Sequence, residues 1–181
     1  MTDNINTLDH WNDLWIQNSA VYPLDVCHIV RFKFVAHLCT FSQRVLDVAS
    51  GPGFLAPYLP AVVIYERLDF CESALKSKPG KYYVADLLNI DSLPGSWDIV
   101  VAMEILEHVD DPARIITLCA GAATHQAIFT VPNDRLGPDQ CPEHVRKYTV
   151  DSFRDLFYKL GFAGKFTIYV LEGSLICRVQ I

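Results

Sequence analysis

The chain has 181 residues, 51% of them hydrophobic, which is enough apolar material for one compact domain with a single core. Its formal net charge of -6 excludes a wide nucleic-acid-binding surface, because binding to phosphates needs clustered Lys and Arg. No charged-then-apolar leader opens the chain, and no apolar stretch approaches the roughly 18 residues of a membrane span, so we expect no membrane insertion.

Residues 5–40 are predicted to be helical, because apolar residues recur there at spacings of three and four, with a break at Pro23. From residue 41 on, short β-branched runs alternate with segments of helical length. Such alternation predicts an α/β fold with a mostly parallel sheet and helices on both faces. The seven expected strands are RVLDV, AVVIYERL, KYYVA, WDIVVA, AIFTV, KFTIYV and LICRVQI.

The last two expected strands are separated only by LEGS, which is too short for a crossover helix, so we expect an antiparallel C-terminal hairpin. We find no linker or internal repeat that would divide the chain. We therefore predict one domain over residues 1–181, with a helical cover (1–40) and an α/β core (41–181). Six cysteines lie without a C-x-x-C pair, mostly in apolar runs, which favours reduced thiols and a cytoplasmic location.

The stretch VLDVASGPGF, residues 45–54, places Asp47 before a loop that holds Gly51 and Gly53. We expect this loop to end a strand and the segment FLAPYL to open a helix, with the two glycines allowing a ligand to approach the backbone. A dinucleotide loop would have a third glycine where this chain has Ala56, and Asp47 would repel a pyrophosphate. A ligand that carries an ammonium and a sulfonium group would instead be attracted.

This stretch resembles the glycine-rich motif of class I S-adenosylmethionine-dependent methyltransferases, an acid followed by G-x-G-x-G, with Ala49 in place of the first glycine. Two later segments resemble the same family. In LDFCESAL, Asp69 matches the acid that accepts hydrogen bonds from both ribose hydroxyls, and Glu66 is a rival in another strand register. In YVADLLN, Asp86 and the Leu87 backbone match the adenine contacts, although Asp86 could equally cap a turn.

The segments SWDIVVAMEILEHVDDP, IFTVPN and CPEHVRKYTVDSFRDLFYKLGF resemble methyltransferases of the ubiquinone-biosynthesis and small-molecule type, and the resemblance spans about residues 42–181. It implies a Rossmann-like seven-stranded sheet, S-adenosyl-L-methionine as cofactor, and O- or N-methylation of a small-molecule acceptor. His108 and His144 are the candidate general bases. The implied cofactor-binding residues are Asp47, Ala49, Ser50, Gly51, Gly53, Glu66, Asp69, Asp86, Leu87, Met103 and Glu104.

Glu104, Glu107 and His108 would share a face of a helix at spacings of three and four, with His144 in a later loop. Small-RNA 2'-O-methyltransferases and some ubiquinone-pathway enzymes use a similar set of two Glu and two His as metal ligands. We assign no metal ligand from the sequence, because a capping Glu and a packed His explain the pattern as well.

The aromatic residues of the predicted cover, Trp11 and Trp15, are expected to form the core or the wall of the pocket. Acceptor recognition is left to the N-terminal helices and to residues 133–148. Two alternatives stay open: a metal-dependent enzyme resembling RNA 2'-O-methyltransferases, which the acidic charge disfavours, and a non-catalytic module that binds S-adenosylmethionine. A homodimer or a protein partner is compatible with either.

Overall fold

The computed structural model describes residues 5–18, 24–133 and 137–181. Its centre is a seven-stranded sheet with the strand order β3-β2-β1-β4-β5-β7-β6. The strands β1 to β5 run parallel to their neighbours, and β7 pairs antiparallel with both β5 and β6. The expected mostly parallel sheet with a reversed C-terminal hairpin is confirmed. The bounds are Arg44–Val48, Ile64–Asp69, Tyr82–Val84, Trp97–Met103, Ala123–Pro132, Phe166–Leu171 and Ser174–Gln180 for β1 to β7.

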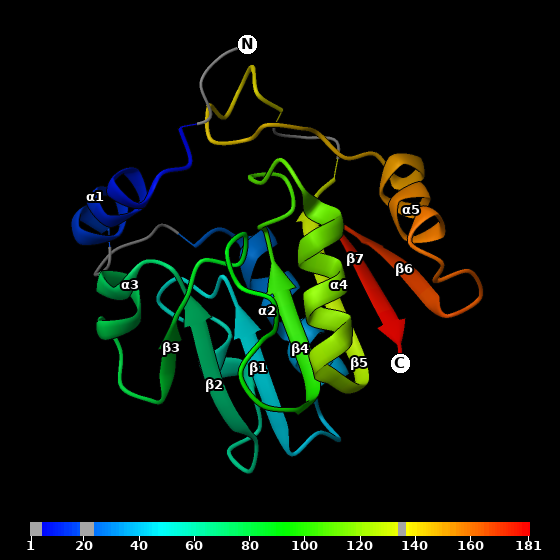
Figure 1. Ribbon diagram of the computed structural model, residues 1–181, viewed down its shortest axis with the longest axis horizontal. Helices are drawn as coiled ribbons and strands as arrows, with labels where there is room; N and C mark the ends of the chain where they lie inside the picture. Colours follow the sequence, from blue (N-terminus) through cyan, green and yellow to red (C-terminus); the bar gives the residue numbers. More distant parts are fainter. Residues whose placement is uncertain (1–4, 19–23, 134–136) are drawn as a thin grey trace.

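Helices cover both faces of this sheet, as Figure 1 shows with α4 in front of the strands and α2 behind them. On one face, α4 (Pro112–Ala122) and α5 (Val150–Lys159) bury Ile115, Ile116, Phe153 and Phe157. On the other, α2 (Val26–Leu38) buries Phe32 and Val35 against β1 and β4. The central strands β1, β4 and β5 are therefore mostly apolar, as expected for strands that are covered on both faces.

The predicted N-terminal cover consists of two helices, α1 (Leu8–Asn18) and α2, and the break expected at Pro23 lies outside the described residues. Asp25 begins α2 by accepting a hydrogen bond from the His28 backbone N–H. Helix α1 lies beside the short helix α3 (Glu72–Lys76) instead of packing on the sheet. The division into a cover and a core at residue 40 stays a prediction.

Two local expectations were wrong. FLAPYL does not begin an α-helix: the chain forms turns and a 3-10 helix, η1 (Ala56–Tyr58), because Pro57 and Pro60 lack the backbone N–H groups that a longer helix needs. Glu104–His108 is a turn and not the start of a helix. Helix α4 begins only at Pro112, where the Asp111 side chain accepts a hydrogen bond from the Arg114 N–H.

All six cysteines are free thiols, and burial raises the pKa of the Cys39 thiol to about 12. Cys39, Cys119 and Cys177 are buried and act as apolar packing groups. Within the described part of the chain, no helix combines the length and the apolar composition that crossing a membrane would require.

Candidate functional site

A cavity of about 470 Å³ opens at the carboxyl ends of β1, β2 and β4. This is the edge at which open α/β sheets place their ligands. The cavity brings together most of the residues that the sequence singled out. Those that line it are Asp47, Ala49, Ser50, Gly51, Asp69, Asp86, Leu87, Met103, Glu104, Glu107, His108 and His144. Gly53 and Glu66 are not among them.

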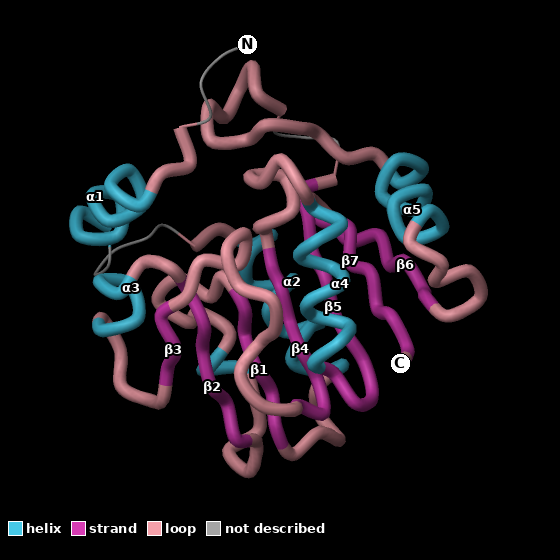
Figure 2. The backbone as a smooth tube through the Cα atoms, viewed as in Figure 1, coloured by secondary structure: helices cyan, strands magenta, loops and turns pink. Residues whose placement is uncertain are grey.

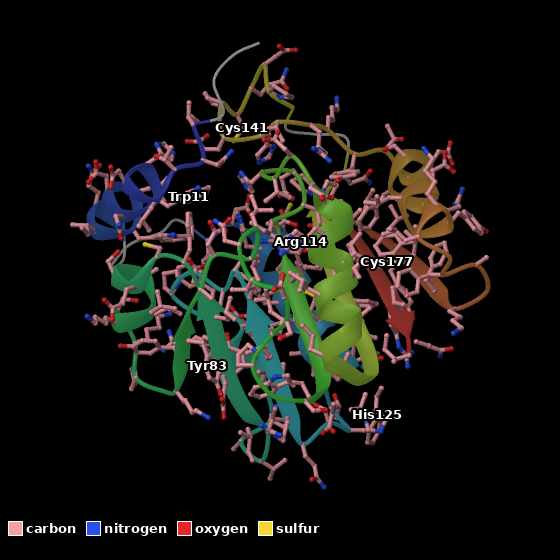
Figure 3. All side chains as sticks on the ribbon, in the orientation of Figure 1. Trp11, Tyr83, Arg114, His125, Cys141 and Cys177 are labelled. Atoms are coloured by element: carbon pink, nitrogen blue, oxygen red, sulfur yellow. The ribbon has the colours of Figure 1, made fainter. Side chains whose placement is uncertain are left out.

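The roof of the cavity comes from two segments far apart in the chain. Trp11 and Trp15 belong to α1, and Cys141, Glu143 and His144 belong to residues 137–149, which Figure 2 shows running across the top of the molecule. Figure 3 labels Trp11 and Cys141 near this upper edge. The expectation that the two tryptophans form a pocket wall agrees with this placement.

The loop after β1 follows the path that its glycines allow. Ala49 has a φ of +53°, the left-handed conformation that glycine adopts most easily, so the alanine at the first glycine position keeps the backbone path of the motif. Gly51 donates its N–H to Asp69 Oδ2 at 2.8 Å. A Cβ on Gly51 would lie 2.9 Å from the Trp15 ring, and one on Gly53 would lie 2.5 Å from Arg67 Cδ. Gly53 is therefore required by the packing of a buried arginine.

Asp47 lies at the floor of the cavity and is 1% exposed. Tyr65 donates its hydroxyl to Asp47 Oδ2 at 2.5 Å, whereas Oδ1 has no hydrogen-bond partner in the described structure. Burial raises the pKa of Asp47 to about 7, against a smaller lowering by Tyr65. An orphaned buried carboxylate oxygen beside a cavity is suited to a cationic ligand group.

Asp69 and Glu66, the two rivals for the ribose, occupy different places. Asp69 is at the end of β2 and receives the N–H groups of Gly51 and Cys71, each at 2.8 Å, one on each carboxylate oxygen. Burial raises the pKa of Asp69 to about 6, opposed by these hydrogen bonds. Glu66 instead accepts a hydrogen bond from the Tyr83 hydroxyl at 2.7 Å and pairs with Lys81 at 3.0 Å. Only Asp69 is oriented toward the cavity.

Asp86 follows β3 and holds a turn, because its carboxylate accepts hydrogen bonds from the Leu88 N–H and the Asn89 amide. It also lines the cavity, next to Leu87. The turn-capping role is present in the structure, and the contact of Asp86 with adenine stays a prediction that its position at the cavity wall allows.

Glu104, one of the implied cofactor-binding residues and a member of the metal-ligand set that the sequence left unassigned, has both carboxylate oxygens engaged. Its Oε2 pairs with Arg31 Nη1 at 3.1 Å, and its Oε1 accepts a hydrogen bond from Thr130 at 2.8 Å. Glu104 has a φ of +52°, which costs about 1–2 kcal/mol for a residue with a Cβ. Backbone strain of this kind concentrates at functional sites.

Arg31 is a cavity residue that the sequence reading missed. It is 6% exposed, comes from α2, and has a buried Nε without a hydrogen-bond partner among the described residues. The available signal was a cation in the otherwise apolar run VCHIVRFKFVAHLC, since a guanidinium is rarely buried without an anionic partner.

Glu107, His108 and His144 form a compact cluster in which one ligand atom from each lies within 4.8 Å of the others. Both oxygens of Glu107 are buried and lack a hydrogen-bond partner in the ranges described. Burial, with the charge of Glu104, raises the pKa of Glu107 well above its usual value. Burial and the neighbouring His144 lower the pKa of His108 to about 4, so its ring is neutral at physiological pH. Two imidazole rings beside a carboxyl group without a hydrogen-bond partner among the described residues fit a divalent cation.

Comparison with known proteins places these features in context. Residues 46–130 match the family model described as "Methyltransferase domain". A ubiquinone biosynthesis O-methyltransferase from Thiobacillus denitrificans is 33% identical over 118 residues, which cover 59% of this chain and 51% of that protein. The enzyme of that name from Albidiferax ferrireducens is 31% identical over 143 residues, covering 66% and 56%. The chain thus spans about half the length of these curated relatives.

Among solved structures, the magnesium protoporphyrin IX methyltransferase from Synechocystis PCC 6803, with bound SAH (S-adenosylhomocysteine), superimposes with a TM-score of 0.71. The alignment covers 95% of this chain and 96% of that one, at 17% identity. At this identity the likeness concerns the fold, and it extends over almost the whole chain.

Proposed function

Because the chain carries a methyltransferase domain, we propose that it transfers a methyl group from S-adenosylmethionine to an oxygen of a small-molecule acceptor. The observation that carries the proposal is the cavity at the carboxyl edge of the sheet, where the glycine loop, Asp69 and Asp86 end successive parallel strands around one space. The O-methyltransferase names of the curated relatives support oxygen as the attacking atom.

The lining residues are distributed as the parts of such a cofactor require. Asp69 is held by two backbone N–H groups, so its remaining lone pairs can accept both hydroxyls of a ribose. Asp86 and Leu87 are placed for the adenine, with Ala49, Ser50 and Met103 between them and the amino acid end. Asp47, with its orphaned Oδ1, faces the ammonium group, and Arg31, with its orphaned Nε, faces the carboxylate.

The reaction needs alignment more than activation of the donor, because the sulfonium is already a good leaving group. When bound, S-adenosylmethionine would supply an activated methyl group: the methyl would pass to the acceptor oxygen, the electron pair of the broken carbon–sulfur bond would go to sulfur, and the acceptor proton would go to solvent or to a nearby base. Trp11 and Trp15 exclude water from this space and hold the reactants in line. The ion pair of Glu104 with Arg31 lies in the same cavity and would help to orient the bound methyl donor.

Glu107, His108 and His144 are proposed to hold a divalent cation next to the acceptor, because the carboxylate has no other partner in the described residues. A bound cation would lower the pKa of an acceptor hydroxyl and orient its oxygen. Without one, His108 or His144 would have to act as the general base that the sequence suggested. Glu104 stays outside this set because Arg31 and Thr130 already occupy its oxygens.

The acceptor contacts the roof in this proposal, since the sheet edge is taken by the cofactor. A cytoplasmic location agrees with six free thiols, and a homodimer or a protein partner is compatible with this proposal. A nucleic-acid acceptor is disfavoured by the net charge of -6.

The decisive experiment has two arms. Calorimetric titration with SAH should show binding, and incubation with radiolabelled S-adenosylmethionine and a panel of phenols, alcohols and small RNAs should label a small molecule. Binding without transfer to any acceptor would favour the non-catalytic module, and labelled RNA would favour the alternative enzyme class. Full activity after exhaustive chelation would contradict the cation and return proton removal to the histidines.

A further inference from the structure

The side chain of Asn6 lies where three segments meet, just before α1. Its Nδ2 donates hydrogen bonds to two backbone carbonyls, His108 O at 3.1 Å and Glu143 O at 2.7 Å. Its Oδ1 accepts a hydrogen bond from Trp11 Nε1 at 3.2 Å. A primary amide has two N–H donors, so each of these two carbonyls can accept one of them.

The Glu143 carbonyl also receives a second hydrogen bond, from the His108 ring. His108 Nδ1 lies 2.9 Å from Glu143 O. A carbonyl only accepts, so Nδ1 carries the proton of the neutral ring and Nε2 has the free lone pair. Nε2 is also the nitrogen that lies 3.9 Å from Glu107 Oε1. The same carbonyl therefore joins the Asn6 amide to the orientation and tautomer of His108.

The two carbonyls that Asn6 bridges belong to the two segments that carry the histidines. His108 itself carries one carbonyl, and the other belongs to Glu143, the residue directly before His144. The two imidazole rings are 4.7 Å apart between centroids and meet edge to face. The edge of the Trp11 ring contacts His108 from the same N-terminal segment, at 5.2 Å between centroids. The turn after β4 and the loop after β5 also meet directly, because the Val145 N–H donates a hydrogen bond to Glu107 O at 2.8 Å. The Asn6 amide, here called the clamp, adds further hydrogen bonds between the two segments next to the histidines.

We propose that Asn6 is the positioning residue of the cation site, holding His108 and His144 at their ligand geometry and His108 in its Nδ1–H tautomer. This inference rests on the proposed function, in which those residues and Glu107 bind a divalent cation. Hydrogen-bond partners of metal-bound histidines orient the ligands, and their loss typically weakens metal affinity about 10- to 100-fold. The N-terminal segment then helps to build the site as well as cover it.

The test compares Asn6→Ala and Asn6→Leu, which removes the donors while keeping the size of the side chain, with Asn12→Ala. Asn12 comes from the same segment and accepts hydrogen bonds from Ser73 and Cys71, so its loss loosens α1 without touching the clamp. Calorimetry would titrate Mn²⁺, Co²⁺ and Zn²⁺ into each full-length variant and follow the cation that the wild type binds most tightly. Both Asn6 variants should bind it about 10- to 100-fold more weakly, and Asn12→Ala should match the wild type.

Titration with SAH provides the second readout. The hydrogen bonds of Asn6 described above go to His108, Glu143 and Trp11, none of which is assigned to the cofactor, so its variants should keep wild-type SAH affinity. A third readout needs no metal: ¹⁵N NMR of the His108 ring should show the Nδ1–H tautomer in the wild type and a mixture of tautomers in Asn6→Ala.

The outcomes separate this inference from the proposed function. Three results would overturn the role of Asn6 and leave the cation site standing. They are wild-type cation affinity in both Asn6 variants, equally weakened cation binding in Asn12→Ala, and an Nε2–H tautomer of His108 in the wild type. A wild-type chain that binds none of the three cations would overturn the site and the inference together, while the methyl-transfer assay would still decide the activity.

Discussion

Replacing Asp47 with Asn tests the electrostatics at the floor of the cavity. Burial raises the pKa of Asp47 from its usual 3.8 to about 7 in the folded chain. Between these two values the unfolded chain has lost the proton and the folded chain keeps it, so the unfolded state binds fewer protons and stability falls as pH rises. Each pH unit in this window costs 1.36 kcal/mol, hence about 3 kcal/mol between pH 5 and pH 7, with no further loss above the folded pKa.

Asp47→Asn should abolish this part of the pH dependence. Urea unfolding of both proteins at pH 5, 6, 7 and 8 would give the free energy of unfolding at each pH. Asn retains an oxygen that can accept the Tyr65 hydroxyl, but it places a buried N–H at the orphaned position, a penalty that does not depend on pH. The free energy of unfolding of the variant, relative to that of the wild type, should therefore rise by about 3 kcal/mol between pH 5 and pH 8, whatever the difference between the two proteins at pH 5.

The other buried carboxyls, Asp69 and Glu107, are present in both proteins, so their contribution largely cancels in the difference. Parallel pH profiles for the two proteins would refute the reasoning. Saturating SAH offers a further check, because an ammonium beside Oδ1 would favour the ionised carboxylate. Bound SAH should then flatten the wild-type profile and leave that of the variant unchanged.

Three further outcomes are expected. Asp69→Asn should weaken SAH binding at least about 10-fold in calorimetry, because charge-assisted hydrogen bonds to the ribose are lost. Glu66 lies outside the cavity, so Glu66→Gln should bind SAH as the wild type does. The reverse result would contradict the assignment of Asp69 to the ribose. Gly53→Ala should lower the free energy of unfolding by about 2–4 kcal/mol in urea titration, because Gly53 has a φ of +77° and the added Cβ would clash with Arg67. Gly164 has a φ of +74° with open space around it, so Gly164→Ala should lower the free energy of unfolding by only about 1–2 kcal/mol. Equal losses in the two variants would exclude the clash. Without a cation, Glu107→Gln should be as stable as the wild type at pH 8, or more stable. A cation at 100 times its Kd should stabilise the wild type by about 2.7 kcal/mol and the variant not at all. A variant that the cation still stabilises would place the cation site elsewhere.

The sequence predicted the sheet well, because the spacing of hydrophobic residues and the residue types in turns determine structure over short stretches of chain. RVLDV, WDIVVA and AIFTV are apolar on both sides, as strands buried on both faces must be, and the short LEGS connection allows only a hairpin. The predictions after the strands failed where one residue overrode the pattern. Pro57 limits the segment after the glycine loop to a 3-10 turn, and the left-handed backbone of Glu104 turns the chain before a helix can form.

The site was predictable where it follows the ends of strands, as for Asp47, Asp69 and Asp86, since these positions converge in any parallel sheet. Contacts across long stretches of sequence carry no such local signal. Neither the pairing of Arg31 with Glu104 nor the bridging of His108 and Glu143 by Asn6 could be derived from spacing, because α2 and the N-terminal segment approach the sheet through tertiary packing.

The strand order has a consequence for how the molecule assembles. β1 lies between β2 and β4, and β4 follows β1 in the chain only after some fifty intervening residues, so the central parallel pairings close long loops. β5 gains its antiparallel partner only when residues 174–180 arrive. Pairings this distant in sequence make folding slow and leave apolar strand edges unpaired in the meantime. Recombinant yield should therefore improve at low temperature or with added chaperone, because aggregation competes with the final hairpin for the open edge of β5.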